Sequence, residues 1–173
     1  MKKKILILFL CSFFSNCFAA NLISVLGGIS TPINYEEQKY FINAPCVDIA
    51  YSYTFTNNIV LETDFSFFYQ KKDIEENLLK NYLFDFTMNC GYALSFNNFS
   101  IVPQIYIGYA RYFFYDDPEI FPKILNFFCY GTFIDFSYSF ANNYRIIIRP
   151  DLVFYDKEFF SPIKMLIGFG INF

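Results

Sequence analysis

Apolar and polar residues alternate along most of this chain, and the alternation is clearest in residues 164–173. Met165, Ile167 and Phe169 belong to a series of apolar side chains at every second position, and a lysine, a leucine, two glycines and an asparagine fill the positions between. Successive side chains of a β-strand point to opposite faces, so this period predicts a strand with one apolar face. Eight such segments are predicted, at residues 22–33, 46–55, 59–69, 82–96, 99–112, 126–140, 144–155 and 164–173.

Three of the connections between these segments are short, and each ends in a pair of asparagines, at residues 56–58, 97–98 and 141–143. Asparagine tolerates the positive φ of tight hairpin turns better than any residue except glycine. Each turn also sets a register, since opposite residues point to the same side of the sheet. The predicted pairs are Phe55 with Ile59, Phe96 with Phe99, and Phe140 with Tyr144. The other four connections, near residues 34–45, 70–81, 113–124 and 156–162, are longer and charged.

Following these registers outward from the turns separates the apolar side chains from the charged ones. Only Arg111, near a strand end, falls on the apolar face. The other face gathers the charged residues Asp48, Glu62, Asp64, Asp85, Asp135, Arg145, Arg149, Asp151 and Lys164. A basic side chain on the lipid-facing wall of a barrel costs about 2 to 4 kcal/mol at the membrane midplane. The apolar face is therefore predicted to face lipid, and the predicted fold class is all-β, an eight-stranded antiparallel transmembrane β-barrel.

A soluble sandwich or lipocalin-like barrel with an apolar interior is the alternative fold. Its core could not hold so many large side chains, because a barrel of eight strands has an interior only wide enough for its own inward residues. The chain is 24% aromatic, and the tyrosines and phenylalanines near strand ends instead predict the interfacial girdles of a membrane barrel. These residues are Tyr53, Tyr69, Tyr82, Tyr109, Tyr138 and Phe154.

The narrow interior predicts that the inward charges form a salt-bridged plug, since an unpaired buried charge is strongly destabilising. The hairpin register places Asp135 directly across from Arg149, with Gln104 at a similar height. The predicted interior charge network consists of Glu62, Asp64, Asp85, Asp135, Arg145, Arg149 and Asp151. A gate for a narrow ion path is the alternative role for the same residues.

Prolines and glycines interrupt the predicted strands at a few positions. Pro103 and Pro150 each remove a ladder hydrogen bond, which predicts a bulge or a local distortion. The glycines at 27–28 and at 168 and 170 lack the strand-turn-helix setting of a phosphate-binding loop. We therefore expect them to allow close packing inside the barrel.

The first 19 residues have the layout of a secretory signal peptide. Three lysines follow Met1, an apolar run follows the lysines, and residues 17–19 form a small-x-small cleavage site. The predicted division is a signal peptide at 1–19 and a barrel domain at 20–173, with lipidation of Cys17 as the alternative. Removing three of 13 basic residues leaves 10 against 16 acidic ones, which argues against nucleic acid as a partner.

The sequence offers little for catalysis. It contains no histidine, which excludes His-based triads and most proton shuttles at neutral pH. Cys46, Cys90 and Cys129 fall on three different predicted strands and predict neither a disulfide framework nor a zinc site. We expect no enzymatic activity, no cofactor and no metal site.

The eight-strand layout, the asparagine turns and the closing Gly-Phe-Gly-Ile-Asn-Phe at 168–173 make the chain resemble the small eight-stranded outer-membrane barrels, the group of the OmpA transmembrane domain and OmpX. The resemblance covers nearly all of the chain after the signal. It implies that Phe169, Ile171 and Phe173 form the C-terminal signal for the outer-membrane assembly machinery, although Leu166 stands where the family prefers a polar residue. It also implies a place in the outer membrane of a diderm bacterium, with the longer loops outside and both termini in the periplasm.

The expected partners are outer-membrane lipid, the assembly machinery and an extracellular or host ligand bound through the loops. The longer connections contain the acidic pairs 36–37, 75–76 and 116–117, which are candidates for binding cations or basic surfaces but are more often simply solvated. The expected function is structural or adhesion-like surface interaction, and the alternative is a narrow ion or small-solute channel.

Overall fold

The computed structural model describes residues 20–33, 43–74, 77–114, 123–140, 143–156 and 161–173. The predicted signal peptide and the three acidic pairs of the loops lie outside these residues. Nine strands are formed: β1 (Ala20–Pro32), β2 (Ala44–Thr54), β3 (Ile59–Ile74), β4 (Asn77–Tyr92), β5 (Leu94–Phe96), β6 (Phe99–Phe114), β7 (Lys123–Phe140), β8 (Tyr144–Tyr155) and β9 (Pro162–Asn172).

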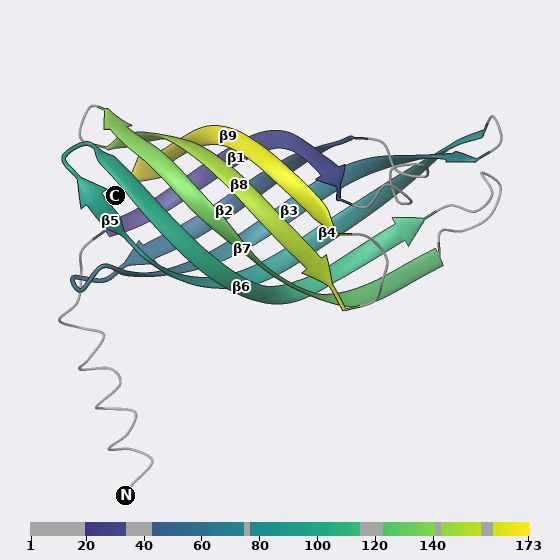
Figure 1. The fold of residues 1–173 in the computed structure, drawn as a ribbon, viewed down its shortest axis with the longest axis horizontal. Helices are drawn as coiled ribbons and strands as arrows, with labels where there is room; N and C mark the ends of the chain where they lie inside the picture. The colour runs from purple at the N-terminus through teal and green to yellow at the C-terminus, as the bar shows by residue number, and fades with distance from the viewer. Residues whose placement is uncertain (1–19, 34–42, 75–76, 115–122, 141–142, 157–160) are drawn as a thin grey trace, which may run out of the picture.

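The strands form one closed antiparallel barrel. They are hydrogen-bonded in the order β4-β3-β2-β1-β9-β8-β7-β6-β5, and a further β4–β6 pairing closes the sheet. β5 continues β4 along β6 in an unchanged register, so β4 and β5 together count as one strand of the barrel and the nine elements form eight barrel strands. The predicted eight-stranded antiparallel barrel is confirmed. Figure 1 shows the C-terminus and the strand ends that flank the short turns at one end of the barrel, here the turn end, and the strand ends that flank the longer connections at the other, the loop end.

The asparagine turns have the predicted registers. Asn58 and Asn97 adopt positive φ angles of 66° and 54°. At the first turn the Phe55 amide donates a 2.8 Å hydrogen bond to the Ile59 carbonyl. Phe96 pairs with Phe99, and Phe140 pairs with Tyr144. The local preference of asparagine therefore fixes which side chains point into the barrel.

Two hairpins are longer than their hydrophobic pattern predicts. β3 and β4 stay paired as far as Ile74 and Asn77, and β6 and β7 as far as Phe114 and Lys123. The loop predicted near 70–81 is therefore largely strand, and the one predicted near 113–124 is strand at both of its ends, with residues 115–122 outside the described part of the chain. Backbone ladders require no apolar side chains, so strands extend beyond the apolar wall, where alternation of hydrophobicity no longer marks them.

The two prolines lie in one row of the sheet. Ile134 pairs with Pro103 on one side and is aligned with Pro150 on the other, where the β7–β8 ladder is interrupted. The break between β4 and β5 lies opposite Pro103 in the same way. The registers on both sides of each break are the same, so the predicted distortion takes the form of a gap in the ladder, with no inserted residue.

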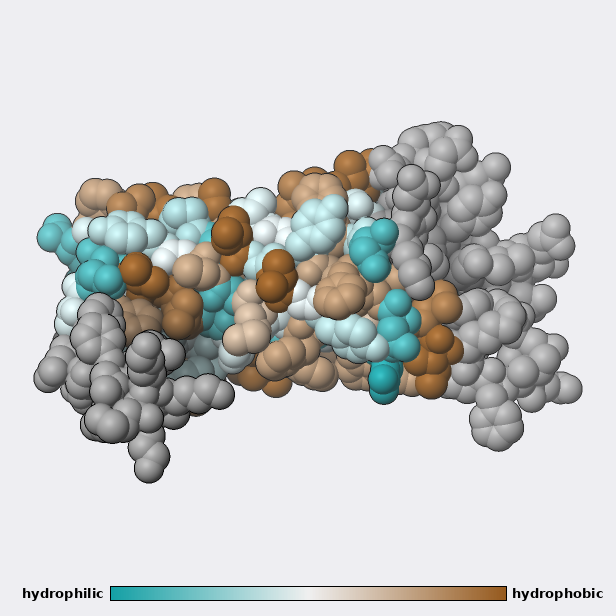
Figure 2. All heavy atoms as spheres, turned by 90° about the horizontal axis from the view of Figure 1, so that it is seen from below, coloured by the Kyte–Doolittle hydropathy of each residue, from teal (hydrophilic) through white to brown (hydrophobic). Residues whose placement is uncertain are grey.

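The outer wall is apolar and the inner face is polar or tightly packed. Ile105 and Phe169 are 69% and 64% exposed, whereas Asp48 and Arg149 are each 1% exposed. Figure 2 shows brown and pale side chains along the side of the barrel and teal clusters toward its two ends. Among the described residues, no helix is long and apolar enough to cross a membrane.

Aromatic rings pair on the exterior near both ends. Tyr53 and Phe55 are 4.7 Å apart between ring centroids at the turn end, and Tyr69 and Tyr82 are 5.6 Å apart toward the loop end. This is the arrangement expected of two interfacial girdles.

The inward glycines permit close contact between strands, with one exception to the prediction. A Cβ on Gly28 would lie 2.9 Å from Leu166 Cα, and one on Gly168 would lie 2.7 Å from Leu26 Cα. Gly27 has nothing within 4 Å of its Cβ position, because an odd residue of this strand points outward. The expectation of close packing was wrong for Gly27.

A closed ladder with no free edge predicts heat-dependent mobility on an SDS gel. The barrel should migrate at a different position when unheated than after boiling, because its inter-strand hydrogen bonds persist in detergent until heated. Electrophoresis of the folded chain with and without boiling measures this. A single position in both lanes, with a random-coil circular dichroism spectrum before boiling, would contradict the closed barrel.

Candidate functional site

The charged side chains inside the barrel form two layers across its lumen. The Arg149 layer consists of Arg149, Glu62, Asp64 and Asp135, and the Lys164 layer consists of Lys164, Asp48, Asp85 and Asp151. β8 lies four strands from β3 in both directions around the barrel, and β9 lies four strands from β4. Ion pairs between these strands therefore span the full diameter of the lumen.

Arg149 pairs with three carboxylates at once. Its Nε donates to Asp135 Oδ1 at 2.6 Å and its Nη2 to Asp135 Oδ2 at 2.9 Å, which makes a bidentate pair between neighbouring strands. Nη1 donates to Asp64 Oδ2 at 2.5 Å and Nη2 to Glu62 Oε1 at 2.7 Å. The Phe133 ring lies under the guanidinium, with Cζ 4.0 Å from the ring centroid. Planar, bidentate recognition is what arginine supplies and lysine does not.

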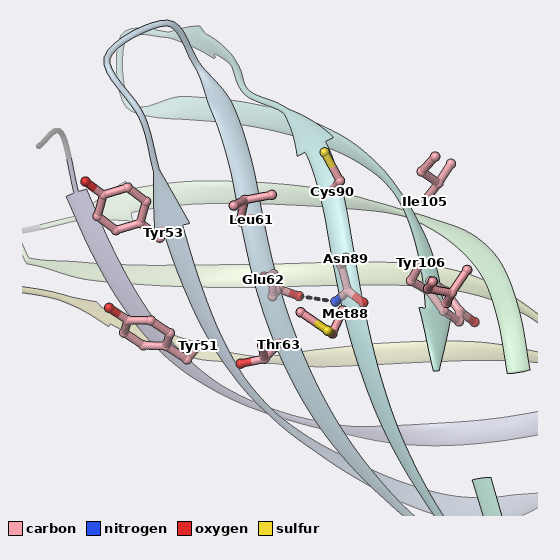
Figure 3. A pocket seen from close by; sticks show the side chains of 11 residues that line it. Tyr51, Tyr53, Leu61, Glu62, Thr63, Met88, Asn89, Cys90, Ile105 and Tyr106 are labelled. Atoms are coloured by element: carbon pink, nitrogen blue, oxygen red, sulfur yellow. Dashed lines mark hydrogen bonds between the residues drawn. The ribbon is translucent and has the colours of Figure 1, made fainter. Parts of the chain in front are cut away.

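Glu62 accepts further hydrogen bonds from uncharged neighbours. Asn89 Nδ2 lies 3.3 Å from Glu62 Oε1, the contact drawn as a dashed line in Figure 3. Gln104 Nε2 lies 3.5 Å from Glu62 Oε2, and the Ser52 hydroxyl donates to the same oxygen. These donors come from β2, β4 and β6, so the carboxylate joins the interior surfaces of several strands.

Lys164 is the cation of the second layer. Its Nζ lies 3.2 Å from Asp151 Oδ2 and 3.2 Å from Ser66 Oγ, with Asp48 and Asp85 oxygens at 3.9 and 4.0 Å. Nζ also lies 4.6 Å from the centroid of the Phe68 ring. Lys164 thus balances charge from three strands at once.

Tyrosine hydroxyls complete the Lys164 layer. Tyr106 donates to Asp151 Oδ1 at 2.9 Å, and Tyr155 donates to Asp85 Oδ2 at 3.1 Å. Buried apolar side chains, among them Leu26, Phe68 and Leu83, pack beside these polar groups. The lumen is therefore filled by side chains, as expected for eight strands.

Within the two layers carboxylates outnumber cations, six against two. Among the described residues, both Asp48 oxygens and one oxygen each of Asp64 and Asp85 accept no hydrogen bond. No group of three or more acidic or cysteine residues in the described part of the chain has the geometry to hold a metal ion. Cys46, Cys90 and Cys129 are free thiols.

A small cavity of about 80 Å³ lies on the turn-end side of the Arg149 layer. Ser52, Ser100, Ser137 and Arg145 are among the residues that line it, and Glu62 and Asp135 are also in contact with it. A space of this size holds a few water molecules at most. The Arg149 layer bounds it on the side toward the loop end.

The structure divides the predicted network residues among three places. Glu62, Asp64, Asp135 and Arg149 meet in one layer, and Asp85 and Asp151 meet in the other. Arg145 forms no ion pair with any residue that the structure describes, and its Nε has no hydrogen-bond partner there.

The central cation of the second layer, Lys164, was predicted to point inward but was not included in the predicted network, and the same holds for Asp48. Tyr106, Tyr155 and Phe133 were missed as partners of the charges. Hairpin registers place residues only on neighbouring strands, so the contacts across the lumen carried no sequence signal beyond the shared inward face.

The predicted C-terminal assembly signal lies on the exterior of the barrel. Phe169, Ile171 and Phe173 are 64%, 51% and 67% exposed, and the Phe173 amide donates to the Asn21 carbonyl at 3.1 Å. The three side chains thus form one apolar outward row on the strand next to β1.

Comparison with solved structures identifies the class of fold. The barrel is similar to Neisserial surface protein A (TM-score 0.70, 10% identity, covering 89% of this chain and 96% of that one). It is also similar to Ail, the attachment invasion locus protein of Yersinia pestis, in complex with the heparin analogue sucrose octasulfate (TM-score 0.61, 13% identity, 89% and 97%). A third such structure is the outer membrane protein OprG of Pseudomonas aeruginosa (TM-score 0.58, 10% identity, 90% and 96%).

The chain therefore has the fold of the small eight-stranded outer-membrane barrels, as the sequence resemblance implied. No protein-family model matches the chain, and no curated protein sequence matches it. At sequence identities of 10% to 13%, the similarity to these structures concerns the fold alone.

Replacing Arg149 with alanine should destabilise the barrel strongly, because it leaves three buried carboxylates without their cation. Breaking a buried ion pair on one side costs about 3 to 5 kcal/mol. The measurement is urea unfolding of the chain refolded into lipid vesicles, followed by tyrosine fluorescence. Arg145→Ala is the matched control, since Arg145 lies on the same strand and also contacts the lumen cavity but has no described ion pair. Equal destabilisation by both variants would contradict the role given to Arg149.

Proposed function

We propose that the chain is an outer-membrane barrel with a closed interior, which acts as a structural or surface-interaction protein and presents its longer loops outside the cell. The observation that supports this most directly is the Arg149 layer, where one buried guanidinium and three carboxylates occupy the lumen. The fold is consistent with an outer-membrane location, and the exposed apolar wall requires lipid around it.

The longer connections support the proposed role in surface interaction. The strand ends that flank the four longer connections lie at one end of the barrel, and the sequences of three of these connections contain acidic pairs. The solved Ail complex holds a heparin analogue, sucrose octasulfate, which is polyanionic. Acidic loops would repel such a ligand, so a basic surface is the better candidate for this chain.

The closed interior predicts that the purified barrel does not conduct in a planar lipid bilayer. No steady single-channel steps are expected at moderate voltage, because the buried side chains of the Arg149 and Lys164 layers occupy the lumen. Recordings of the wild-type protein and of Arg149→Ala test this, with the exterior variant Arg111→Ala as control. Steady wild-type conductance that Arg149→Ala alters and Arg111→Ala does not would replace the plug with the alternative, a narrow channel.

The assembly machinery is a further proposed partner, through Phe169, Ile171 and Phe173. Deleting Phe173 should lower the amount of barrel in the outer membrane, since the terminal aromatic of the last strand is the proposed signal. Quantitative immunoblotting of outer-membrane fractions measures this. Phe140→Ala, which removes another exposed aromatic side chain at the turn end, is the control. Undiminished levels after the deletion would count against the signal.

A further inference from the structure

The outer wall of the barrel is hollowed over β2, β3, β4 and β6. The hollow, of about 590 Å³, is here called the wall trough. The strand registers arrange its outward side chains in two adjacent rows. One row is Tyr53, Leu61, Cys90 and Ile105, and the next is Tyr51, Thr63, Met88 and Ile107.

Side-chain size explains the hollow. Figure 3 shows Tyr51 and Tyr53 on one side, Ile105 on the other, and the short side chains of Thr63 and Cys90 between them. The tyrosines of β2 and the isoleucines of β6 are ridges. On the two middle strands Thr63 and Cys90 are the low points of the floor, each beside a longer side chain, Met88 or Leu61. The lining is almost entirely apolar, since Glu62 and Asn89 direct their polar groups into the lumen.

A second hollow of about 230 Å³ adjoins the first. It shares Tyr51 and Thr63 with the wall trough and is also lined by Ile49, Phe65 and Phe86. The two hollows together make an elongated depression that runs from the turn end toward the middle of the wall. A long, thin, flexible apolar molecule has the shape to fill such a depression.

We propose that the wall trough binds one acyl chain of a membrane phospholipid and retains that lipid more tightly than the rest of the wall does. The proposal rests on the membrane location given above. The trough is open toward the membrane-facing side of the wall, so the molecules in contact with it are the hydrocarbon chains of lipids. A second barrel would present a convex wall, which would rest on the ridges and leave the floor empty, at a loss of dispersion contacts.

The position of the trough places the lipid in one leaflet. Tyr53 and Leu61 are separated from the asparagine turn only by Phe55 and Ile59 among the outward residues, so the trough begins close to the turn end. The Tyr51 hydroxyl donates to Asn21 Oδ1 at 2.9 Å, which marks a polar edge beside the apolar floor. The acyl chain would therefore enter from the leaflet on the turn-end side, with its headgroup near this edge.

Filling the floor tests the proposal. The full chain is purified from membranes in a mild detergent, incubated with palmitoyl-oleoyl phosphatidylethanolamine, and examined by native mass spectrometry for lipid bound to each barrel. Thr63→Leu and Cys90→Leu are the filling variants, and either one suffices if the other fails to fold. Ile167→Leu on β9 is the control, because Ile167 is 60% exposed and lies outside both hollows.

The wild type and Ile167→Leu should each retain one phospholipid, and a filling variant should retain roughly tenfold less, equivalent to about 1.4 kcal/mol. Equal retention in all variants, or none in the wild type, would overturn the proposal. So would paired barrels that separate on filling, since the trough would then join two copies. The heat-dependent gel shift and flotation with membranes test the proposed function separately. A chain that passes both and retains no lipid refutes the trough alone.

Discussion

The structure depends on the ion pairs that one fully buried guanidinium, that of Arg149, makes with three carboxylates. Arg149 holds Asp135 on the neighbouring strand and Glu62 and Asp64 on the strand diametrically opposite, so it fixes two relationships at once. Buried ion pairs are often no more stabilising than apolar side chains of the same volume. Their effect here is on register: a slip of β3 by one residue would turn Glu62 and Asp64 outward and bring Thr63 inside. The guanidinium would then keep only Asp135, and two carboxylates would face lipid, which disfavours the slipped barrel.

Charge is distributed unevenly around the lumen. Four of the six carboxylates in the two layers line β2, β3 and β4, and the other two, Asp135 and Asp151, lie on β7 and β8. The two paired cations, Arg149 and Lys164, project from β8 and β9, opposite the larger group. Attraction across the lumen therefore draws opposite walls together, in addition to the hydrogen bonds between neighbours. Polar residues at inward positions keep the strands from becoming continuous apolar runs, and in β1 and β6 these are uncharged, for example Ser24 and Gln104. A continuous apolar run would resemble a membrane-spanning helix, and the alternation avoids this while still presenting an apolar wall to lipid.

The fold was predictable from the sequence because its determinants are local. The alternation gives each strand two faces, and a pair of asparagines at a turn such as 97–98 sets which residues oppose each other. The pair Asp135 and Arg149 followed from one such hairpin. The contacts of Arg149 with Glu62 and of Lys164 with Asp85 did not, since 87 residues separate the first pair and strand tilt decides which heights meet across the lumen. Strand ends were also underestimated, because ladders continue where the apolar pattern stops.

The pleat of the strands joins the interior layer to the outer wall. Glu62 and Asp64 point inward to Arg149, and Thr63 between them points outward to the floor of the wall trough. Asn89 likewise points inward to Glu62 between the outward side chains of Met88 and Cys90. The trough thus lies directly behind the Arg149 layer, on backbone held in place by its ion pairs. A short outward side chain such as Thr63 costs little stability there, because the inward ion pairs of Glu62 and Asp64 already hold this part of β3 in place. The outer wall can therefore contain the trough at the level where the ion pairs of the Arg149 layer join the strands across the lumen.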